Sequence, residues 1–239
     1  MRSLIDINCD MGEGMPNDAL IMPFISSANI ACGSHAGDEQ IMQQTIELAI
    51  ENNVFIGAHP SFPDRENFGR TNMHLPAEKI YDIVKAQIEL LQDLAFKKNS
   101  SLHHVKPHGA LYNMAANDEI LAAAICKAII SIDPLLLVYE LSGSKFISVA
   151  ESMGLKAYHE VFADRSYQED GTLTPRSQPN ALLNTEQEVA AQVKQFVDSK
   201  SVTTTNGKTL PLKVDTICIH GDGAQALRFA QIINQVVQA

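Results

Sequence analysis

Ionisable side chains recur along this chain of 239 residues in six short clusters, each directly after an apolar, strand-like segment. The clusters are Asn8–Gly14, Cys32–Asp38, Gly57–Pro60, Lys106–Gly109, Glu160–Arg165 and His220–Asp222. Carboxylates, imidazoles and amines are the groups that enzymes use to move protons and to hold charged substrates. Clusters at the ends of successive strands are typical of an α/β barrel, whose active site lies at the carboxyl ends of the strands. This repetition predicts an enzyme.

Four histidines at the ends of expected strands are the main candidates for acid–base chemistry. They are His35, His59, His108 and His220. Small residues flank His35, and Pro60 holds His59 in extended backbone, from which its imidazole can point into a barrel mouth. A lone histidine is more often a packed core residue, but four in equivalent positions favour a shared site. The other four, which lack that position, are left unassigned: His74, His103, His104 and His159.

Two acidic residues and a lysine are candidates for the centre of the site. Asp10 and Glu13 follow the first expected strand, three residues apart, and could bind a divalent cation or supply a general base. The alternative for this pair is a solvated turn with helix-capping carboxylates. A lysine that faces a barrel interior, as expected for Lys106, is costly unless it meets an anion. Lys106 therefore predicts a bound carboxylate or phosphate, or a pair with Asp10, with a purely structural ion pair as the alternative.

Basic residues further along the chain could bind a small anionic substrate. Arg165 follows Glu160 and Asp164 at the end of one expected strand, and Arg176 lies in the loop beyond it. A bidentate arginine is the natural partner of a small carboxylate. The last expected helix begins shortly after Asp222, and its free N–H groups could also receive an anion.

Three local motifs are expected to have structural roles. Asp38 stands where a helix begins and is expected to cap it. Thr185 and Glu188 have the spacing of a capping box. Gly207-Lys208-Thr209 looks like the end of a phosphate-binding loop, but Val202 stands where that loop needs a glycine, so a hairpin turn is expected.

Composition limits the classes of partner and location. The formal net charge of −10 and the pI of about 5.2 would repel phosphate backbones and anionic lipids, so neither nucleic acid nor a membrane is expected as a partner. No apolar segment is long enough to span a bilayer and no leader segment is recognisable, which predicts a cytoplasmic location. The four cysteines lack the paired spacing of a zinc knot or redox pair and are expected to be buried thiols.

The hydrophobic pattern switches repeatedly between strand-like runs and helical stripes, which is typical of β/α units and a parallel sheet. Strands are expected at 4–9, 28–32, 54–58, 102–106, 135–139, 157–162 and 216–220. Helices are expected at 41–49, 76–94, 119–131, 145–153, 184–198 and 224–237, and a hairpin near 202–212. About seven units predict an α/β fold with a distorted or incomplete (β/α) barrel, in one domain spanning 1–239. An open doubly wound sheet is the alternative, although no Gly-rich dinucleotide loop follows the first strand.

With these segments assembled, the chain resembles the LamB/YcsF family of lactam-utilisation proteins over nearly its whole length. The matching segments are Asn8–Glu13, Asn29–Asp38, Gly57–Pro60, Phe68–Arg70, Val105–Asn113, Glu160–Arg165 and Cys218–Asp222. The resemblance implies a glycoside hydrolase/deacetylase-like (β/α) barrel. It also implies a 5-oxoprolinase activity, converting 5-oxo-L-proline to L-glutamate with hydrolysis of ATP to ADP and phosphate. In that activity the chain would serve as the A subunit beside partner subunits B and C.

The implied reaction suggests roles for the candidate residues. An unstrained lactam opens slowly, so ATP would phosphorylate the amide oxygen before water attacks the ring carbonyl. Water would be activated by His35, His59 or Asp10, and Lys106 would hold the phosphoryl charge. The leaving nitrogen would be protonated by His108 or His220. Substrate contacts are expected from Glu13, Arg70, Tyr112, Glu160, Asp164, Arg165 and Arg176, with Arg165 or Arg176 on the substrate carboxylate.

ATP with Mg²⁺ is the expected cofactor, and the sequence leaves open whether this chain or a partner binds it. A further hypothesis is a protein-bound divalent metal held by Asp10, His59 and a neighbouring histidine or glutamate. Two alternative functions stay open: a metal-dependent deacetylase or amidohydrolase acting alone, and a non-catalytic subunit that binds the lactam. The density of acids and bases argues against the second, because a pure binding pocket is mostly apolar.

Overall fold

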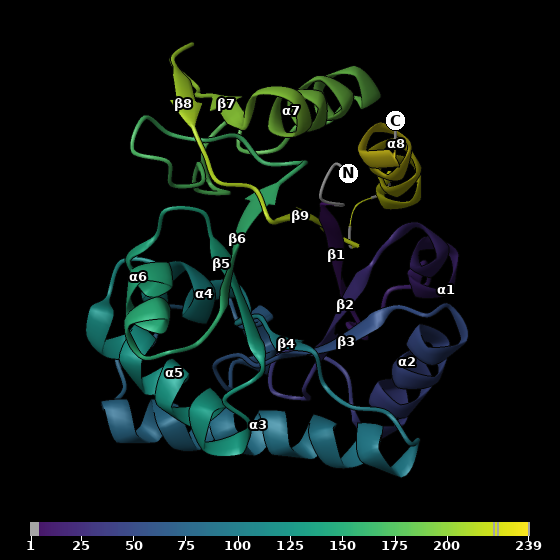
Figure 1. Ribbon diagram of the computed structural model, residues 1–239, viewed down its shortest axis with the longest axis vertical. Coiled ribbons are helices and arrows are strands. Elements are labelled where there is room, and N and C mark those ends of the chain that lie inside the picture. Colours follow the sequence, from purple (N-terminus) through teal and green to yellow (C-terminus); the bar gives the residue numbers. More distant parts are fainter. Residues whose placement is uncertain (1–4, 222, 224, 239) are drawn as a thin grey trace.

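Seven parallel strands close into a barrel in the computed structural model, which describes residues 5–221, 223 and 225–238 (Figure 1). The strands are β1 (Asp6–Met11), β2 (Ser27–Ala31), β3 (Phe55–His59), β4 (His104–Val105), β5 (Leu137–Leu141), β6 (Ala157–Phe162) and β9 (Thr216–Ile219). They follow one another round the ring in chain order, and β9 pairs in parallel with both β6 and β1 to close it. The expected seven-stranded barrel is confirmed, and the alternative of an open sheet is wrong.

Helices form a layer outside the ring of strands (Figure 1). The longer ones are α2 (Glu39–Glu51), α3 (Ala77–Lys97), α5 (Glu119–Ile132), α6 (Lys145–Ser152), α7 (Glu186–Ser199) and α8 (Ala226–Gln238). Each corresponds to an expected helix. Short elements that the hydrophobic pattern did not predict are α1 (Asp18–Ile21), η1 (Met22–Phe24), η2 (Arg65–Asn67) and α4 (Gly109–Ala115). Elements of one or two turns carry too few apolar positions to show a helical period.

The helix termini follow the expected capping motifs. The Asp38 side chain accepts a hydrogen bond from the backbone N–H of Ile41, which confirms it as the N-cap of α2. Thr185 and Glu188 form a capping box at the start of α7, because each side chain accepts from the other's backbone N–H. These caps satisfy N–H groups that have no partner within the helix.

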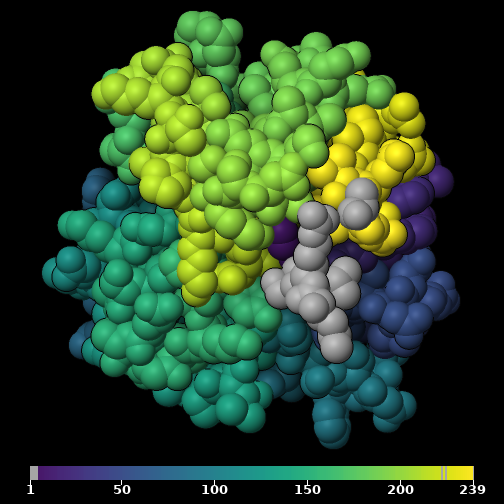
Figure 2. Space-filling model, turned by 45° about the horizontal axis from the view of Figure 1, so that its top comes forward, coloured from purple at the N-terminus to yellow at the C-terminus, as the bar shows by residue number. Residues whose placement is uncertain are grey.

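An added hairpin follows α7, as expected. Strands β7 (Ser201–Thr203) and β8 (Thr209–Pro211) pair antiparallel, and Gly207 adopts a positive φ of 82° in the turn between them. The segment Gly207-Lys208-Thr209 is therefore a hairpin turn rather than a phosphate-binding loop. In Figure 2 the light-green region of α7 and the hairpin lies beside the yellow α8, and α7 packs against α8.

The interior of the barrel is filled by hydrogen-bonded polar side chains. Asn29 donates to the Asn8 side chain at 2.7 Å, and the His104 ring lies 2.7 Å from Asn29 Oδ1. His104 also stacks on Tyr139 at 4.0 Å between ring centroids. Barrels of this class more often fill their interior with branched aliphatic residues. Here the aliphatic core lies mainly between the strands and the helices, and the polar layers inside the ring support the polar site above them.

The structure tests two further predictions, one about the cysteines and one about membrane-spanning helices. The cysteines Cys9, Cys32, Cys126 and Cys218 are all buried free thiols, as expected. Among the helices that the structure describes, none has the length and apolar content required to cross a bilayer. The cytoplasmic location and the single domain spanning 1–239 stay predictions.

The tight packing around His104 leads to a stability prediction. A methyl group added at Gly57 would lie 2.1 Å from Nε2 of His104, and this imidazole is completely buried. Gly57→Ala should therefore lower the free energy of unfolding by about 1–3 kcal/mol, because the interior is overpacked. Chemical denaturation would measure the change. Gly223→Ala is the matched control, since its added methyl meets nothing within 4 Å. Equal stabilities for the two variants would contradict this account of the barrel interior.

Candidate active site

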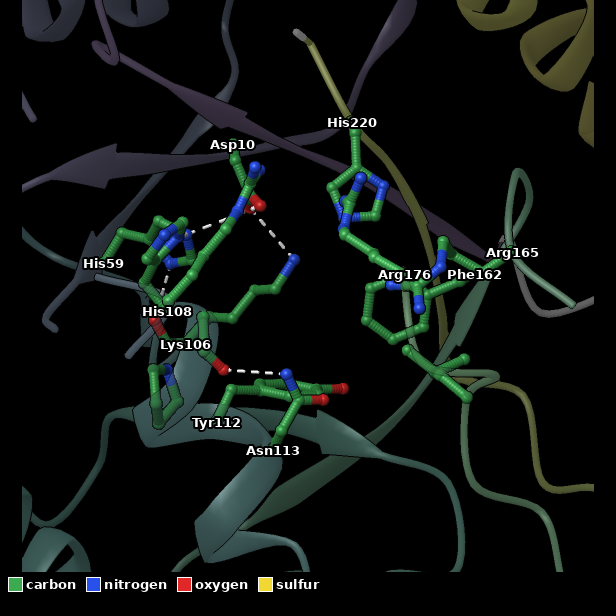
Figure 3. A pocket seen from close by; sticks show the side chains of 14 residues that line it. Asp10, His59, Lys106, His108, Tyr112, Asn113, Phe162, Arg165, Arg176 and His220 are labelled. Carbon is green, nitrogen blue, oxygen red and sulfur yellow. Dashed lines mark hydrogen bonds and ion pairs between the residues drawn. The ribbon is translucent and has the colours of Figure 1, made fainter. Parts of the chain in front are cut away.

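A polar cavity of about 70 Å³ opens at the carboxyl ends of the strands (Figure 3). Most of the residues predicted from the sequence line it: Asp10, His59, Arg70, Lys106, His108, Tyr112, Arg165, Arg176 and His220. Four other predicted residues are not among those that line it: Glu13, His35, Glu160 and Asp164. Asp222 falls outside the residues that the structure describes. The ionisable residues that follow successive strands in the sequence therefore do lie close together in the structure, as expected.

A buried lysine occupies the centre of the site. Lys106 is 2% exposed, and its Nζ lies 2.9 Å from Oδ1 of Asp10 and 2.9 Å from Oε1 of Glu160. Burial alone would lower the pKa of Lys106, but the adjacent carboxylates, Asp10 foremost, raise it well above its ordinary value. Burial would likewise raise the pKa of Asp10, yet His59 and Lys106 hold it well below its ordinary value. The lysine and Asp10 therefore form a charged pair inside the protein, as one of the sequence alternatives predicted.

Glu160 supports this lysine from behind. Its side chain is completely buried and is not among the residues that line the cavity. One carboxylate oxygen accepts from the Asn8 amide at 2.9 Å, and the other accepts from the Tyr112 hydroxyl at 2.7 Å. Asn8 and Tyr112 thus fix the Glu160 carboxylate, which in turn positions the ammonium group of Lys106. The prediction of a direct substrate contact by Glu160 has no support in this arrangement.

Three histidines and Glu13 form a compact cluster beside Asp10, hereafter the histidine cluster. The rings of His35 and His108 stack at 3.8 Å between centroids. Oε1 of Glu13 lies 3.1 Å from Nε2 of His35, 3.4 Å from Nδ1 of His108 and 3.9 Å from Nε2 of His59. The closest approach between rings joins Nδ1 of His108 to Nε2 of His59, at 2.9 Å.

Backbone carbonyls fix the orientation of two of these rings. Nδ1 of His59 lies 2.7 Å from the carbonyl oxygen of Lys106, and Nε2 of His108 lies 2.9 Å from that of Phe68. A carbonyl oxygen only accepts, so each of these nitrogens carries a proton. The loop allows the close approach because Gly69 has a positive φ of 67°, and a Cβ there would lie 2.9 Å from the His108 ring.

The environment keeps two of the rings neutral. Burial, followed by the charge of His59, lowers the pKa of His35 to about 3. Burial, followed by His59 and His35, lowers the pKa of His108 well below its ordinary value. Neutral imidazoles can accept a proton from water or bind a cation.

The opposite wall of the cavity carries the remaining predicted residues. Nδ1 of His220 lies 3.0 Å from the Asp164 carboxylate, which orients the ring. Burial would raise the pKa of Asp164, but His220 and two arginines lower it. The Arg165 guanidinium donates to the carbonyls of Ala181 and Thr174, so it braces the loop after β6. Arg176 is exposed and lies beside His220 in Figure 3, which makes it the better-placed anion ligand of the two predicted arginines.

Some supporting residues were missed by sequence reasoning. Asn8, Asn29 and His104 join the network beneath the cavity. His104 had been left unassigned because it does not stand at the end of its strand. The feature of the sequence that could have identified His104 is its two-residue spacing from Lys106, since alternate residues of a strand point to the same face.

Comparison with known proteins agrees with this geometry. Residues 5–239 match the LamB/YcsF family. The chain belongs to the LamB/YcsF family. A relative in Tolumonas auensis, named as the A subunit of 5-oxoprolinase, is 52% identical and covers 95% of this chain and 92% of its own length. A relative of the same name in Brevibacillus brevis is 49% identical, with 98% and 94% covered. The resemblance predicted from the sequence motifs is confirmed.

Solved structures give the same result for the LamB/YcsF fold. The crystal structure of the lactam utilization protein from Thermus thermophilus superposes with a TM-score of 0.92 at 35% identity, covering 99% of this chain and 96% of that one. A putative cellobiose-phosphate cleavage protein from Enterococcus faecalis has a TM-score of 0.59 at 13% identity, covering 98% of this chain and 91% of that one. This second likeness concerns the fold alone.

The buried lysine generates a stability prediction. Lys106→Met leaves Asp10 and Glu160 as uncompensated buried carboxylates and should lower the free energy of unfolding by about 3–5 kcal/mol at neutral pH. The difference in the free energy of unfolding between Lys106→Met and the wild type should become smaller below about pH 5. In the wild type, the stability due to the low pKa of Asp10 is present above the unfolded pKa of about 3.9 and is lost as the pH falls. Urea unfolding across this pH range would measure both effects.

Lys194→Met is the matched control for this measurement. It removes an ammonium group of an exposed ion pair with Asp198, in which Lys194 is 72% and Asp198 45% exposed. Exposed pairs contribute about 0–1 kcal/mol. If the two lysine variants lost the same stability, Lys106 would not be the counter-ion described above.

Proposed function

We propose that this chain is the lactam-opening A subunit of an ATP-dependent 5-oxoprolinase, converting 5-oxo-L-proline to L-glutamate with partner subunits B and C. The observation that carries the proposal is the arrangement of the cavity. Cationic groups for a small anionic substrate, Lys106 and Arg176, share it with the imidazoles of His59 and His108. The names of relatives about 50% identical over nearly the full length support the same activity.

The reaction requires that an unreactive amide be activated. Transfer of the γ-phosphoryl group of ATP to the lactam oxygen makes the ring carbon electrophilic. Addition of water to that carbon, with loss of a proton to a base, gives a tetrahedral intermediate. Cleavage of the C–N bond with protonation of the nitrogen then gives an acyl phosphate, and its hydrolysis releases glutamate and phosphate.

The residues of the cavity fit the steps after activation. Asp10 and His59, with 3.4 Å between Oδ2 and Nε2, are the proposed pair that accepts the proton from water. Lys106 is placed to stabilise the negative charge of the phosphoryl group and of the tetrahedral intermediate. His220, oriented by Asp164, is the proposed donor to the leaving nitrogen. Arg176 is the proposed ligand of the substrate carboxylate.

ATP, with its Mg²⁺, is assigned to the partner subunits. Gly207-Lys208-Thr209, the segment most like a phosphate-binding loop, is part of a hairpin turn instead. This division of labour makes the chain inactive by itself.

Reconstitution tests the activity as a whole. ADP and glutamate should form with 5-oxo-L-proline only when this chain is mixed with both partners. His59→Ala and Lys106→Ala should each lower glutamate formation by the complex at least about 100-fold, because an acid–base group or charge stabilisation is lost. ATP turnover that ignored 5-oxo-L-proline in every mixture would contradict the proposal. Release of acetate from acetylated sugars by this chain alone would support the deacetylase alternative instead.

A second prediction isolates the carboxylate ligand. Arg176→Ala should lower kcat/KM of the complex for 5-oxo-L-proline about 10- to 100-fold, since a charge-assisted hydrogen bond is lost. For 2-pyrrolidinone, the same ring without its carboxylate, the variant and the wild type should be equal. Arg228→Ala, on the exposed side of α8, is the matched control. An equal loss for both lactams would show that Arg176 does not bind the carboxylate.

A further inference from the structure

Two ring nitrogens in the histidine cluster face each other as acceptors. The second nitrogen of each ring donates to a carbonyl oxygen, at 2.7 Å for His59 and 2.9 Å for His108. In their neutral forms, Nε2 of His59 and Nδ1 of His108 therefore both present lone pairs, across 2.9 Å. Two lone pairs at this distance repel unless a positive species lies between them. The geometry requires either an additional proton or a cation.

The distances within the cluster match the ligand shell of a small metal ion. Donors bound at about 2.0–2.1 Å to a tetrahedral ion lie about 3.3 Å from one another. The measured separations are 2.9 Å between His59 and His108, 3.4 Å between His108 and Glu13, and 3.9 Å between His59 and Glu13. A donor atom of His35 also lies within 4.8 Å of these three, but the His35 ring is stacked parallel on that of His108 at 3.8 Å, and an imidazole binds a metal ion in its own ring plane. The carbonyl contacts of His59 and His108 are also the outer contacts that orient metal-binding imidazoles.

We propose that Glu13, His59 and His108 bind one divalent transition-metal ion, such as zinc, while His35 contacts Glu13 from outside the ligand shell. Two imidazoles and one carboxylate are a donor set that suits such ions and leaves a fourth position open. His59 and His108 line the cavity, so the ion would have a coordination position open to it. This donor set differs from the sequence hypothesis, which placed Asp10 in the shell, because Asp10 is not among the donors of this cluster that all lie within 4.8 Å of one another.

A second group of potential ligands nearby does not compete with this assignment. Asp10, Cys218 and His220 also lie within reach of a common point. However, the Lys106 ammonium already contacts Oδ1 of Asp10 at 2.9 Å and Sγ of Cys218 at 3.1 Å. A metal ion there would face the buried positive charge of Lys106, whereas a metal ion in the histidine cluster would meet the carboxylate of Glu13.

The chemical role of the ion rests on the proposed function. Beside the lactam, the bound ion would lower the pKa of a water molecule or polarise the ring carbonyl. Nε2 of His59 would then be occupied by the ion, so Asp10, 3.4 Å from it, would be the member of the proposed pair that accepts the proton from that water. Metal binding itself can be measured without lactam, ATP or partners, so its failure is separate from that of the lactam-opening activity.

Cobalt binding to the full chain tests the site. Metal-stripped wild type titrated with Co²⁺ should bind one ion per chain, with visible absorption bands of a nitrogen- and oxygen-ligated ion, and its Tm should rise. His59→Ala and His108→Ala should each weaken binding at least about 100-fold, since loss of outer contacts alone costs 10- to 100-fold. Glu13→Gln, which keeps the shape of the side chain, should weaken binding in a protein that still folds by circular dichroism.

His220→Gln is the matched control, because it alters the same cavity and belongs to the competing group. It should bind Co²⁺ as the wild type does. The proposal is overturned if the wild type binds no Co²⁺ above background, if the histidine-cluster variants bind it unchanged, or if His220→Gln alone removes it. Full glutamate formation by a complex built with metal-free chain would overturn the catalytic role of the ion and leave the proposed function standing.

Discussion

A charged lysine inside a barrel has to be neutralised by groups that are already in place. Lys106 lies 2.9 Å from the carboxylates of both Asp10 and Glu160, and each of these is fixed by further side chains. Asn29 donates to Asp10, while Tyr112 donates to Glu160. One ammonium group thus ties β1, β2, β4, β6 and α4 to a common point. The positions of the remaining site residues follow from where these elements are held.

This constraint also explains the unusual interior of the barrel. A layer of aliphatic side chains directly beneath a buried ion pair would leave the unused lone pairs and protons without partners, at a cost of several kcal/mol per charge. The amides of Asn8 and Asn29 and the ring of His104 supply those partners instead. The polar network beneath the cavity is therefore part of the site, although it is sealed from solvent.

Much of the fold could be predicted because strand and helix periods are local properties of the sequence. The strand Ala157–Phe162 has the expected bounds, and the caps at Asp38 and Thr185 are formed as expected. In contrast, α4 begins at Gly109, inside a segment whose residue types indicate a catalytic loop, and seven residues are too few for a clear helical stripe. Closure of the ring by β9 depends on pairing between distant segments, which no local pattern records.

The residues of the site likewise differ in how much of their role could be predicted from the local sequence. Residue type and position at a strand end were sufficient to find the lysine and the histidines. They were not sufficient to separate Glu160, which supports Lys106, from residues that face the cavity, or to show that Arg165 braces a loop. Those distinctions depend on which side chains meet across the barrel. Contacts of this kind are set by register and closure rather than by the sequence near each residue.

The loop that follows His59 and the loop that carries His108 cannot vary independently. The backbone N–H of Ala110 donates to the Gly69 carbonyl at 2.9 Å, and a Cβ at Gly109 would lie 2.6 Å from that same oxygen. Both glycines have positive φ angles, so a side chain at either one would be strained and would push the two loops apart. Residues 60–70 and 106–116 would therefore have to be transplanted together if this part of the site were moved into another barrel.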